Sequence, residues 1–266
     1  MFQLLQHLKK QGAKIMKFTQ VKIKNLIKQS LEMGDIGHPL MDDYYNWYTR
    51  LVNHPNPYYK LFYLLSKELK PNFVVELGSY RAGAAGHFAA GNPDATVLTI
   101  DMHKDMPQQQ PDKDACLRHA RLIENLTYIN KCTVDNMPEY GFNCAIDDVK
   151  AVSKPIDILY IDAWHDEKYV RREWELYSPL LADNALVICD DLMNNNGIFA
   201  GMEKWWQSHT GQKFVDSQVH PGIPMGFLRF ERKVKNAKSK TTTRKTSTAK
   251  KTTAKKKSTA KASKNI

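Results

Sequence analysis

Residues 156–192 read IDILYIDAWHDEKYVRREWELYSPLLADNALVICDDL, and this stretch decides the fold. Two apolar runs, 158–161 and 185–189, flank a segment that is long enough for a helix. Two buried strands separated by a helix are typical of a βαβ unit, whose strands run parallel. Each run ends at an acidic residue, so both strands deliver carboxylates to the edge where open α/β sheets bind ligands. The polar residues at this expected edge are Asp162, His165, Asp190 and Asp191.

The same alternation of apolar runs and helix-length segments extends through most of the chain. We expect strands at 73–77, 96–100, 126–129, 158–161, 185–189, 213–219 and 226–231. We expect several helices, which include those at 84–90, 115–125 and 197–209, and a polar loop at 102–114. This order predicts an α/β fold with a doubly wound, mostly parallel, seven-stranded sheet that ends in an antiparallel hairpin.

The formal charge of +11 is concentrated at the two ends of the chain. Residues 1–31 contain seven Lys and no acid, and residues 232–266 contain 14 Lys and Arg and no acid, whereas residues 32–231 contain 18 basic and 28 acidic residues. We therefore expect a basic amphipathic extension over 1–36, a globular domain over 37–232 and a disordered Lys/Thr/Ala-rich tail over 233–266. The acidic domain argues against a nucleic-acid groove, so the tail is the expected partner of nucleic acid or other polyanions.

The basic extension mixes Lys with apolar residues at helical spacing, including Ile23, Leu26 and Ile27. Two interpretations stay open: a helix that caps the domain, and a helix that attaches to an acidic membrane surface. No apolar run is long enough to span a bilayer, and the N-terminus lacks the apolar core of a signal peptide. The four cysteines show no metal-type spacing, so we expect reduced thiols and a cytoplasmic protein.

The first expected strand leads into a tight turn of small residues before a helix, Glu76-Leu77-Gly78-Ser79-Tyr80-Arg81-Ala82-Gly83-Ala84. Gly78 lets a ligand approach the backbone, and the helix N-terminus offers free N–H groups. Asp101 ends the next strand, where an acid can bind both hydroxyls of a ribose. The loop has no Gly-Lys-Ser/Thr, which argues against triphosphate binding. An ordinary α/β turn with a strand-end acid is the alternative.

This loop and the acid that ends the second strand resemble those of class I S-adenosylmethionine-dependent methyltransferases, and the resemblance covers roughly residues 60–231. It implies a Rossmann-like sheet, a methyltransferase domain over 37–232 and S-adenosylmethionine as cofactor. The cofactor-binding residues that it implies are Glu76, Gly78, Ser79, Tyr80, Gly83 and Asp101. After the third strand, Cys132-Thr133 and Asp135 are alternatives for contacting the adenine base, and Thr133 is the predicted contact.

A second set of motifs resembles one subgroup of these enzymes. Asp162-x-x-His165 after the fourth strand and Asp190-Asp191 after the fifth are similar to motifs of the metal-dependent sugar O-methyltransferases of the macrocin type and their cephalosporin-biosynthesis relatives. The positions that also match by spacing are Glu173 and Pro179. The positions that depart are Glu167, Asn184-Ala185 and Asp190, where Tyr, Gly-Gly and Glu are usual.

The resemblance implies an O-methyltransferase that transfers a methyl group to a hydroxyl of a sugar or another small molecule. Asp162, Asp190 and Asp191 are the implied ligands of a divalent cation, and their hard oxygens suit Mg²⁺. A cation held in this way lowers the pKa of the acceptor hydroxyl and orients it. His165 is the implied general base, and Asp162 is the second implied catalytic residue.

Other interpretations of these residues stay open. His165 can start a helix without taking part in chemistry, and Asp190-Asp191 can cap the helix that follows. We expect His103 at the surface, and we expect packing roles for Trp164, Trp205 and Trp206. Two other functions also stay open: a nucleic-acid or protein methyltransferase recruited by the basic tail, and a non-enzymatic polyanion-binding adaptor with a vestigial pocket.

Overall fold

The computed structural model describes residues 19–52, 57–104, 106–137, 141–192, 200–219 and 223–232. The predicted tail at 233–266 and residues 1–18 of the predicted extension lie outside this part of the chain. Among the residues that the structure describes, no helix is long and apolar enough to cross a bilayer. All four cysteines lie within them as free thiols, as the sequence predicts.

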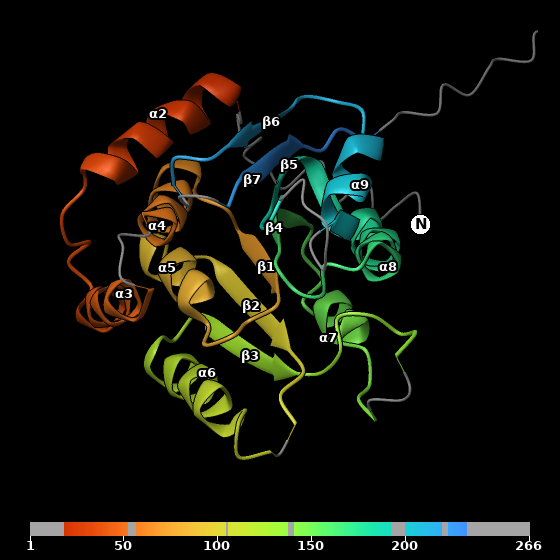
Figure 1. Ribbon diagram of the computed structural model, residues 1–266, viewed down its shortest axis with the longest axis horizontal. Coiled ribbons are helices and arrows are strands. Elements are labelled where there is room, and N and C mark those ends of the chain that lie inside the picture. The colour runs from red at the N-terminus through yellow and green to blue at the C-terminus, as the bar shows by residue number, and fades with distance from the viewer. Residues whose placement is uncertain are drawn as a thin grey trace, which may run out of the picture. The chain divides into compact units, whose positions relative to one another are not determined.

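In the described residues, seven strands form one sheet in the order β3-β2-β1-β4-β5-β7-β6 (Figure 1). The strands are β1 (Phe73–Leu77), β2 (Thr96–Asp101), β3 (Leu126–Asn130), β4 (Ile156–Ile161), β5 (Leu181–Cys189), β6 (Lys213–Asp216) and β7 (Met225–Arg229). Strands β1 to β5 pair in parallel, whereas β7 is antiparallel to both β5 and β6. The predicted α/β fold with a terminal antiparallel hairpin is confirmed.

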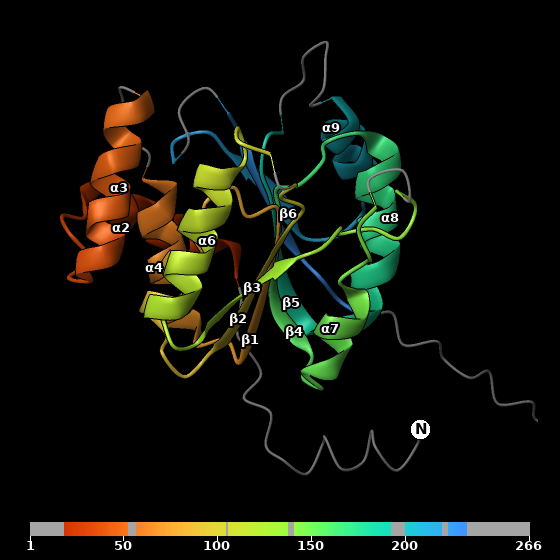
Figure 2. The ribbon, with the colours of Figure 1, turned by 90° about the horizontal axis from the view of Figure 1, so that it is seen from below.

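Helices cover both faces of the sheet. Their bounds are α2 (Gln20–Glu32), α3 (Pro39–Val52), α4 (Tyr58–Leu69), α5 (Gly83–Gly91), α6 (Gln110–Leu122), α7 (Ile146–Ala151), α8 (Glu167–Tyr177), the 3₁₀ turn η2 (Ser178–Leu180) and α9 (Ala200–Ser208). Figure 2 shows α2, α3, α4 and α6 on one side of the strands and α7, α8 and α9 on the other. Helical connections on both faces make the sheet doubly wound, as predicted.

The central strand β4 shows why its apolar run predicts a buried strand. Ile158 and Tyr160 enter the hydrophobic core that contains α4 and α5, whereas Leu159 and Ile161 enter the core that contains α8. Successive side chains of a strand point to opposite faces of the sheet. Because helices cover both faces, residues 158–161 of the strand are all buried and form a continuous apolar run.

The N-terminal helix α2 packs against α4. Its apolar residues Ile23, Leu26 and Ile27 are buried. Lys22 Nζ also donates a hydrogen bond to α4, at the carbonyl oxygen of Glu68, at 2.9 Å. The apolar face of α2 is therefore occupied by the domain itself, which favours the capping helix over attachment to a membrane.

Two elements begin four or more residues before their predicted starts. The helix predicted at 115–125 is α6, which begins at Gln110, so the predicted loop is wrong over its last residues. Pro111 lies in the first turn of α6, where a proline is tolerated because the missing N–H would have no partner in the helix. Strand β5 begins at Leu181 instead of residue 185, and its pairing with β4 shifts register over the added residues.

Candidate functional site

The carboxyl ends of β1, β4 and β5 lie side by side. The backbone N–H of Asp162 donates to the carbonyl oxygen of Leu77 at 2.8 Å, and the N–H of Asp190 donates to that of Ile161 at 3.1 Å. These two bonds extend the parallel pairing by one residue past β4 and β5. They bring Asp162 and Asp190 to the same edge of the sheet, where the sequence predicts them.

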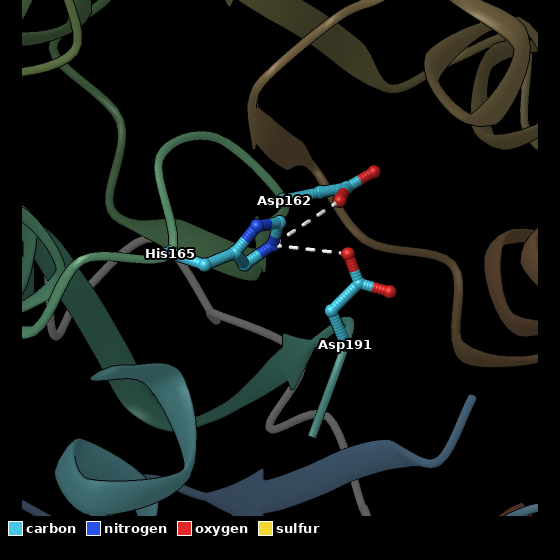
Figure 3. A group of neighbouring side chains, drawn as sticks. All are labelled: Asp162, His165 and Asp191. Atoms are coloured by element: carbon cyan, nitrogen blue, oxygen red, sulfur yellow. Dashed lines mark ion pairs between the residues drawn. The ribbon is translucent and has the colours of Figure 1, made fainter. Parts of the chain in front are cut away.

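Asp162, His165 and Asp191 point toward one another at this edge (Figure 3). The Nε2 atom of His165 is 3.7 Å from Asp162 Oδ1 and 3.4 Å from Asp191 Oδ2. One potential ligand atom from each residue lies within 4.8 Å of the others. Two carboxylate oxygens and an imidazole nitrogen at such separations can hold a divalent cation. We call these three residues the acidic cluster.

The electrostatics of the acidic cluster favour a bound positive charge. Although 32% of the Asp162 side chain is exposed, the surrounding protein desolvates its carboxylate and raises its pKa well above the usual value. The negative charges of Asp190 and Asp191 raise this pKa further. A cation would offset the repulsion between the carboxylates, so the donor set and its charge fit a hard divalent ion such as Mg²⁺.

His165 lies in the turn between β4 and α8, and helix α9 fixes this turn. A Cβ on Gly201 of α9 would collide with the carbonyl oxygen of His165 and the backbone nitrogen of Glu167, so the two segments are in direct backbone contact. Burial lowers the pKa of His165, and the negative charge of Asp190 opposes this effect. The imidazole is therefore neutral near pH 7 and can accept a proton.

Asp190 lies behind the acidic cluster and is only 4% exposed. Its Oδ2 accepts a hydrogen bond from the hydroxyl of Tyr160 at 2.8 Å. Its Oδ1 accepts a hydrogen bond from the backbone N–H of Asp191 at 3.0 Å. Of the two neighbouring acids, the structure brings Asp191 into the acidic cluster and keeps Asp190 in the protein interior. Metal ligation by Asp190 stays a prediction.

A cleft of about 300 Å³, which we call the first cleft, opens beside the acidic cluster. The predicted cofactor residues that line it are Gly78, Tyr80, Asp101 and Thr133. Asp162 and Trp164 also line this cleft, so it reaches the acidic cluster. Gly78 lies against the backbone of Asp162, where an added Cβ would collide with the carbonyl oxygen. The loop after β1 and the end of β4 are thus in direct contact.

Asp101 ties the loop after β1 to the end of β2. Its Oδ2 accepts hydrogen bonds from the backbone N–H groups of Ser79 at 2.8 Å and Tyr80 at 2.9 Å. Its Oδ1 accepts one from the N–H of Met102 at 2.7 Å. Tyr80 adopts a left-handed backbone conformation with φ 47°. The acid that the sequence predicts as a ribose ligand therefore also shapes the loop around it.

The other three predicted cofactor residues support the loop and are not among the described residues that line the first cleft. Glu76 is buried and accepts a hydrogen bond from the Thr99 hydroxyl, and burial raises its pKa to about 8. The hydroxyl of Ser79 lies 2.5 Å from that of Thr99. Gly83 begins α5 at a point where a Cβ would collide with the ring of Tyr44. These residues set the path of the loop.

Thr133 is held in the wall of the first cleft by a buried acid. Its hydroxyl donates a hydrogen bond to Oε1 of Glu173 at 2.5 Å. Glu173 lies in α8 and is fully buried, and burial raises its pKa to about 8. The acid that matches the subgroup by spacing therefore contacts the residue that the sequence predicts at the adenine base.

We expect Glu173→Gln to make stability less dependent on pH. The folded-state pKa of about 8 exceeds the unfolded value of about 4.3, so the folded protein holds more protons between these pH values, and stability falls as pH rises through this window. Gln keeps an acceptor for Thr133 and carries no charge. From pH 5 to pH 9, urea unfolding should show wild type losing about 2 kcal/mol or more relative to the variant. Equal pH dependence of the two proteins would contradict this assignment.

The first cleft also contains residues that the sequence did not predict. His103 is 5% exposed and lines this cleft, with Nδ1 2.7 Å from the hydroxyl of Tyr128, so its predicted surface position is wrong. It follows Asp101 by two residues, and the strand-end position that identifies Asp101 could have identified it as well.

The predicted packing of Trp205 and Trp206 is confirmed, because both are buried in the core.

A second cleft of about 680 Å³ adjoins the first. His165 lines it from the turn after β4, and Lys204 lines it from α9. Ala163 and Trp164 line both clefts. Because Asp162 lines the first cleft and His165 the second, the acidic cluster lies where the two clefts meet. The arrangement can hold two small molecules on either side of a base and its carboxylates.

Comparison with known families agrees with this geometry. Residues 75–192 match a family model that describes a methyltransferase domain. This segment begins in β1, ends just after the acidic pair and contains every predicted cofactor, catalytic and metal residue. No curated protein matches the chain.

Solved structures show the same fold. A methyltransferase from Podospora anserina, in its SAH-bound form, is 15% identical, and the similarity covers 82% of this chain and 100% of that chain with a TM-score of 0.50. An O-methyltransferase family protein from Burkholderia thailandensis is 10% identical, with coverage of 81% of this chain and 70% of that chain and a TM-score of 0.50. At these identities the likeness concerns the fold alone.

Proposed function

We propose that this chain, an S-adenosylmethionine-dependent methyltransferase with its methyltransferase domain at residues 75–192, transfers the methyl group to a hydroxyl of a small molecule. The observation that carries the proposal is the acidic cluster at the junction of the two clefts. A neutral imidazole beside two carboxylates suits the deprotonation of a hydroxyl. A non-enzymatic adaptor would have no use for such a group, so the adaptor function is set aside.

The first cleft is the proposed site for S-adenosylmethionine. It lies at the carboxyl ends of β1 and β2, the edge where parallel sheets bind nucleotides. Asp101 lines it, and a carboxylate at this position can accept hydrogen bonds from ribose hydroxyls in addition to those from the loop. Thr133 stays the predicted neighbour of the adenine base. Because Asp162 lines the same cleft, a cofactor bound there lies next to the acidic cluster.

The proposed reaction needs a base and an aligned acceptor. Nε2 of His165 takes the proton of the acceptor hydroxyl, the acceptor oxygen forms a bond to the methyl carbon, and the bond from that carbon to the sulfonium sulfur breaks. The protonated imidazole that results lies beside Asp162 and Asp191, whose negative charges stabilise it. Alignment of the acceptor with the methyl group supplies much of the rate enhancement.

Asp162 and Asp191 would hold a divalent cation through their carboxylate oxygens, with Mg²⁺ as the proposed ion, so that Nε2 of His165 remains the base. When bound, such an ion lowers the pKa of a coordinated hydroxyl and orients it. The desolvated, mutually repelling carboxylates of the acidic cluster support this part of the proposal.

The second cleft is the proposed acceptor site, because His165 lines it and the base must reach the acceptor hydroxyl. Trp164 borders this cleft and is 49% exposed, so it offers an aromatic face to an acceptor ring. A sugar fits such a site, since it combines hydroxyl groups with a face of C–H bonds. A sugar is therefore the proposed acceptor class.

Titration calorimetry tests this function. We expect S-adenosylmethionine to bind wild type with an affinity that changes little when Mg²⁺ is added. Asp191→Ala should keep S-adenosylmethionine binding and lose Mg²⁺ binding, because it removes a carboxylate of the acidic cluster. Asp147→Ala is the matched control: this carboxylate is exposed on α7 and pairs only with Lys150 among the ion pairs of the described residues. Wild type that fails to bind S-adenosylmethionine would contradict the proposal.

A further inference from the structure

The hydroxyl of Tyr160 lies between two carboxylates. It is 2.8 Å from Oδ2 of Asp190 and 3.0 Å from Oδ2 of Asp162, within donating distance of both. Tyr160 is fully buried, and its ring packs against that of Phe62 in α4 with the centroids 4.8 Å apart. The packed ring therefore holds the hydroxyl in a fixed position beneath the acidic cluster.

The register of the sheet explains this arrangement. Tyr160 in β4 pairs with Ile188 in β5. Every second residue of a strand points to the same face. Asp162 and Asp190 each follow one member of this pair by two residues, so they lie on the same face as Tyr160. A tyrosine at this position reaches the ends of both strands with its hydroxyl.

The contact with Tyr160 decides which oxygen Asp162 presents to the acidic cluster. Oδ2 of Asp162 is the oxygen next to the Tyr160 hydroxyl. Oδ1 faces Nε2 of His165 at 3.7 Å, and Figure 3 shows the other oxygen turned away from the imidazole. Asp162 therefore offers a single oxygen, Oδ1, to an ion bound by the acidic cluster.

Asp190 links the Tyr160 hydroxyl to Asp191 through two hydrogen bonds. One of its oxygens accepts the bond from Tyr160, and the other accepts the bond from the backbone N–H of Asp191. Asp191 has a φ of 54°, a left-handed conformation that residues other than glycine adopt rarely. The bond from its N–H to the Asp190 side chain stabilises this turn, which directs the Asp191 carboxylate toward His165.

We propose that Tyr160 and Asp190 are positioning residues that fix the carboxylates of Asp162 and Asp191 for a divalent cation. This inference rests on the proposed function, because it requires that the acidic cluster binds the ion. It gives Asp190 a role through its neighbours instead of as a ligand. Residues that orient metal ligands in this way typically change metal affinity by 10- to 100-fold when they are replaced.

Tyr160→Phe tests the inference, because it removes the hydroxyl and keeps the ring. We expect the Mg²⁺ affinity measured by calorimetry to fall by roughly 10-fold or more, while the affinity for S-adenosylhomocysteine stays within about 2-fold of wild type. Asp190→Asn should weaken Mg²⁺ binding in the same way. Tyr177→Phe is the matched control: Tyr177 is also fully buried, and its hydroxyl has no hydrogen-bond partner in the described part of the chain.

Three results would overturn the inference that Tyr160 and Asp190 position the cation ligands. Mg²⁺ binding by Tyr160→Phe as tight as that of wild type, or tighter, would overturn the inference and leave the proposed function intact. Loss of both Mg²⁺ and S-adenosylhomocysteine binding, with a melting temperature well below that of Tyr177→Phe, would show a general structural role and also overturn it. Wild type that binds S-adenosylhomocysteine but no Mg²⁺ would remove the cation from the proposed function, and the inference with it.

Discussion

Replacing His165 by Ala is expected to lower the rate of methyl transfer by roughly 10²–10⁴-fold, the range typical for loss of a general base. His165 lines the second cleft and is not among the described residues that line the first. The affinity for S-adenosylmethionine should therefore stay close to that of wild type. The rate of S-adenosylhomocysteine formation, measured with saturating cofactor and a panel of sugars, checks this expectation.

His209→Ala is the control for this experiment. His209 packs against Trp174 and Trp205, with ring centroids 4.7 and 4.2 Å apart, and it is absent from the acidic cluster. Its replacement should lower stability through lost packing and leave the rate per folded molecule largely unchanged. A rate for His165→Ala within about threefold of wild type would exclude His165 as the group that takes the proton.

The second large effect is expected from Gly78→Ala. A Cβ at this position would collide with the carbonyl oxygen of Asp162 and lie 2.7 Å from the backbone nitrogen of Ala163. The φ of +94° is also one that only glycine adopts readily. Backbone strain and overpacking cost about 1–3 kcal/mol each, so we expect a loss of stability of about 3 kcal/mol or more. Displacement of Asp162 should weaken Mg²⁺ binding as well.

Urea unfolding measures this effect, with Gly34→Ala as the control. Gly34 has an ordinary backbone conformation, and no atom lies within 4 Å of a Cβ added there. Its substitution should change the free energy of unfolding by no more than about 0.5 kcal/mol. Equal stabilities of the two variants would mean that the loop and the end of β4 move apart without cost, contrary to the contact described above.

The strands could be predicted from the sequence because helices cover both faces of the sheet. A strand that is buried on both sides is apolar at nearly every position, so the strand predicted at 73–77 coincides with β1. The edge of the sheet could be located for the same reason. The apolar run of β4 ends where the chain leaves the core, and Asp162 is the first residue past that point.

The different positions of the Asp190 and Asp191 carboxylates could not be predicted from the sequence. Asp190 and Asp191 are neighbours in the sequence, and only the left-handed turn at Asp191 sends their carboxylates in different directions. The hydroxyl that donates to Asp190 belongs to Tyr160 on another strand. A local sequence pattern does not show such a contact between strands. The sequence likewise explains Gly78 by the approach of a ligand, whereas the structure shows that the backbone of Asp162 already leaves no room for a side chain.

This backbone contact between Gly78 and Asp162 has a consequence for allostery. Two binding sites are coupled when each ligand favours a different arrangement of an element that they share. The contact, which leaves no space for even a methyl group, holds the loop and the end of β4 together, so we expect neither ligand to shift one against the other. Cofactor and cation are therefore expected to bind with a coupling free energy close to zero. By reciprocity, each ligand then leaves the affinity for the other unchanged, so either can bind first with its full affinity.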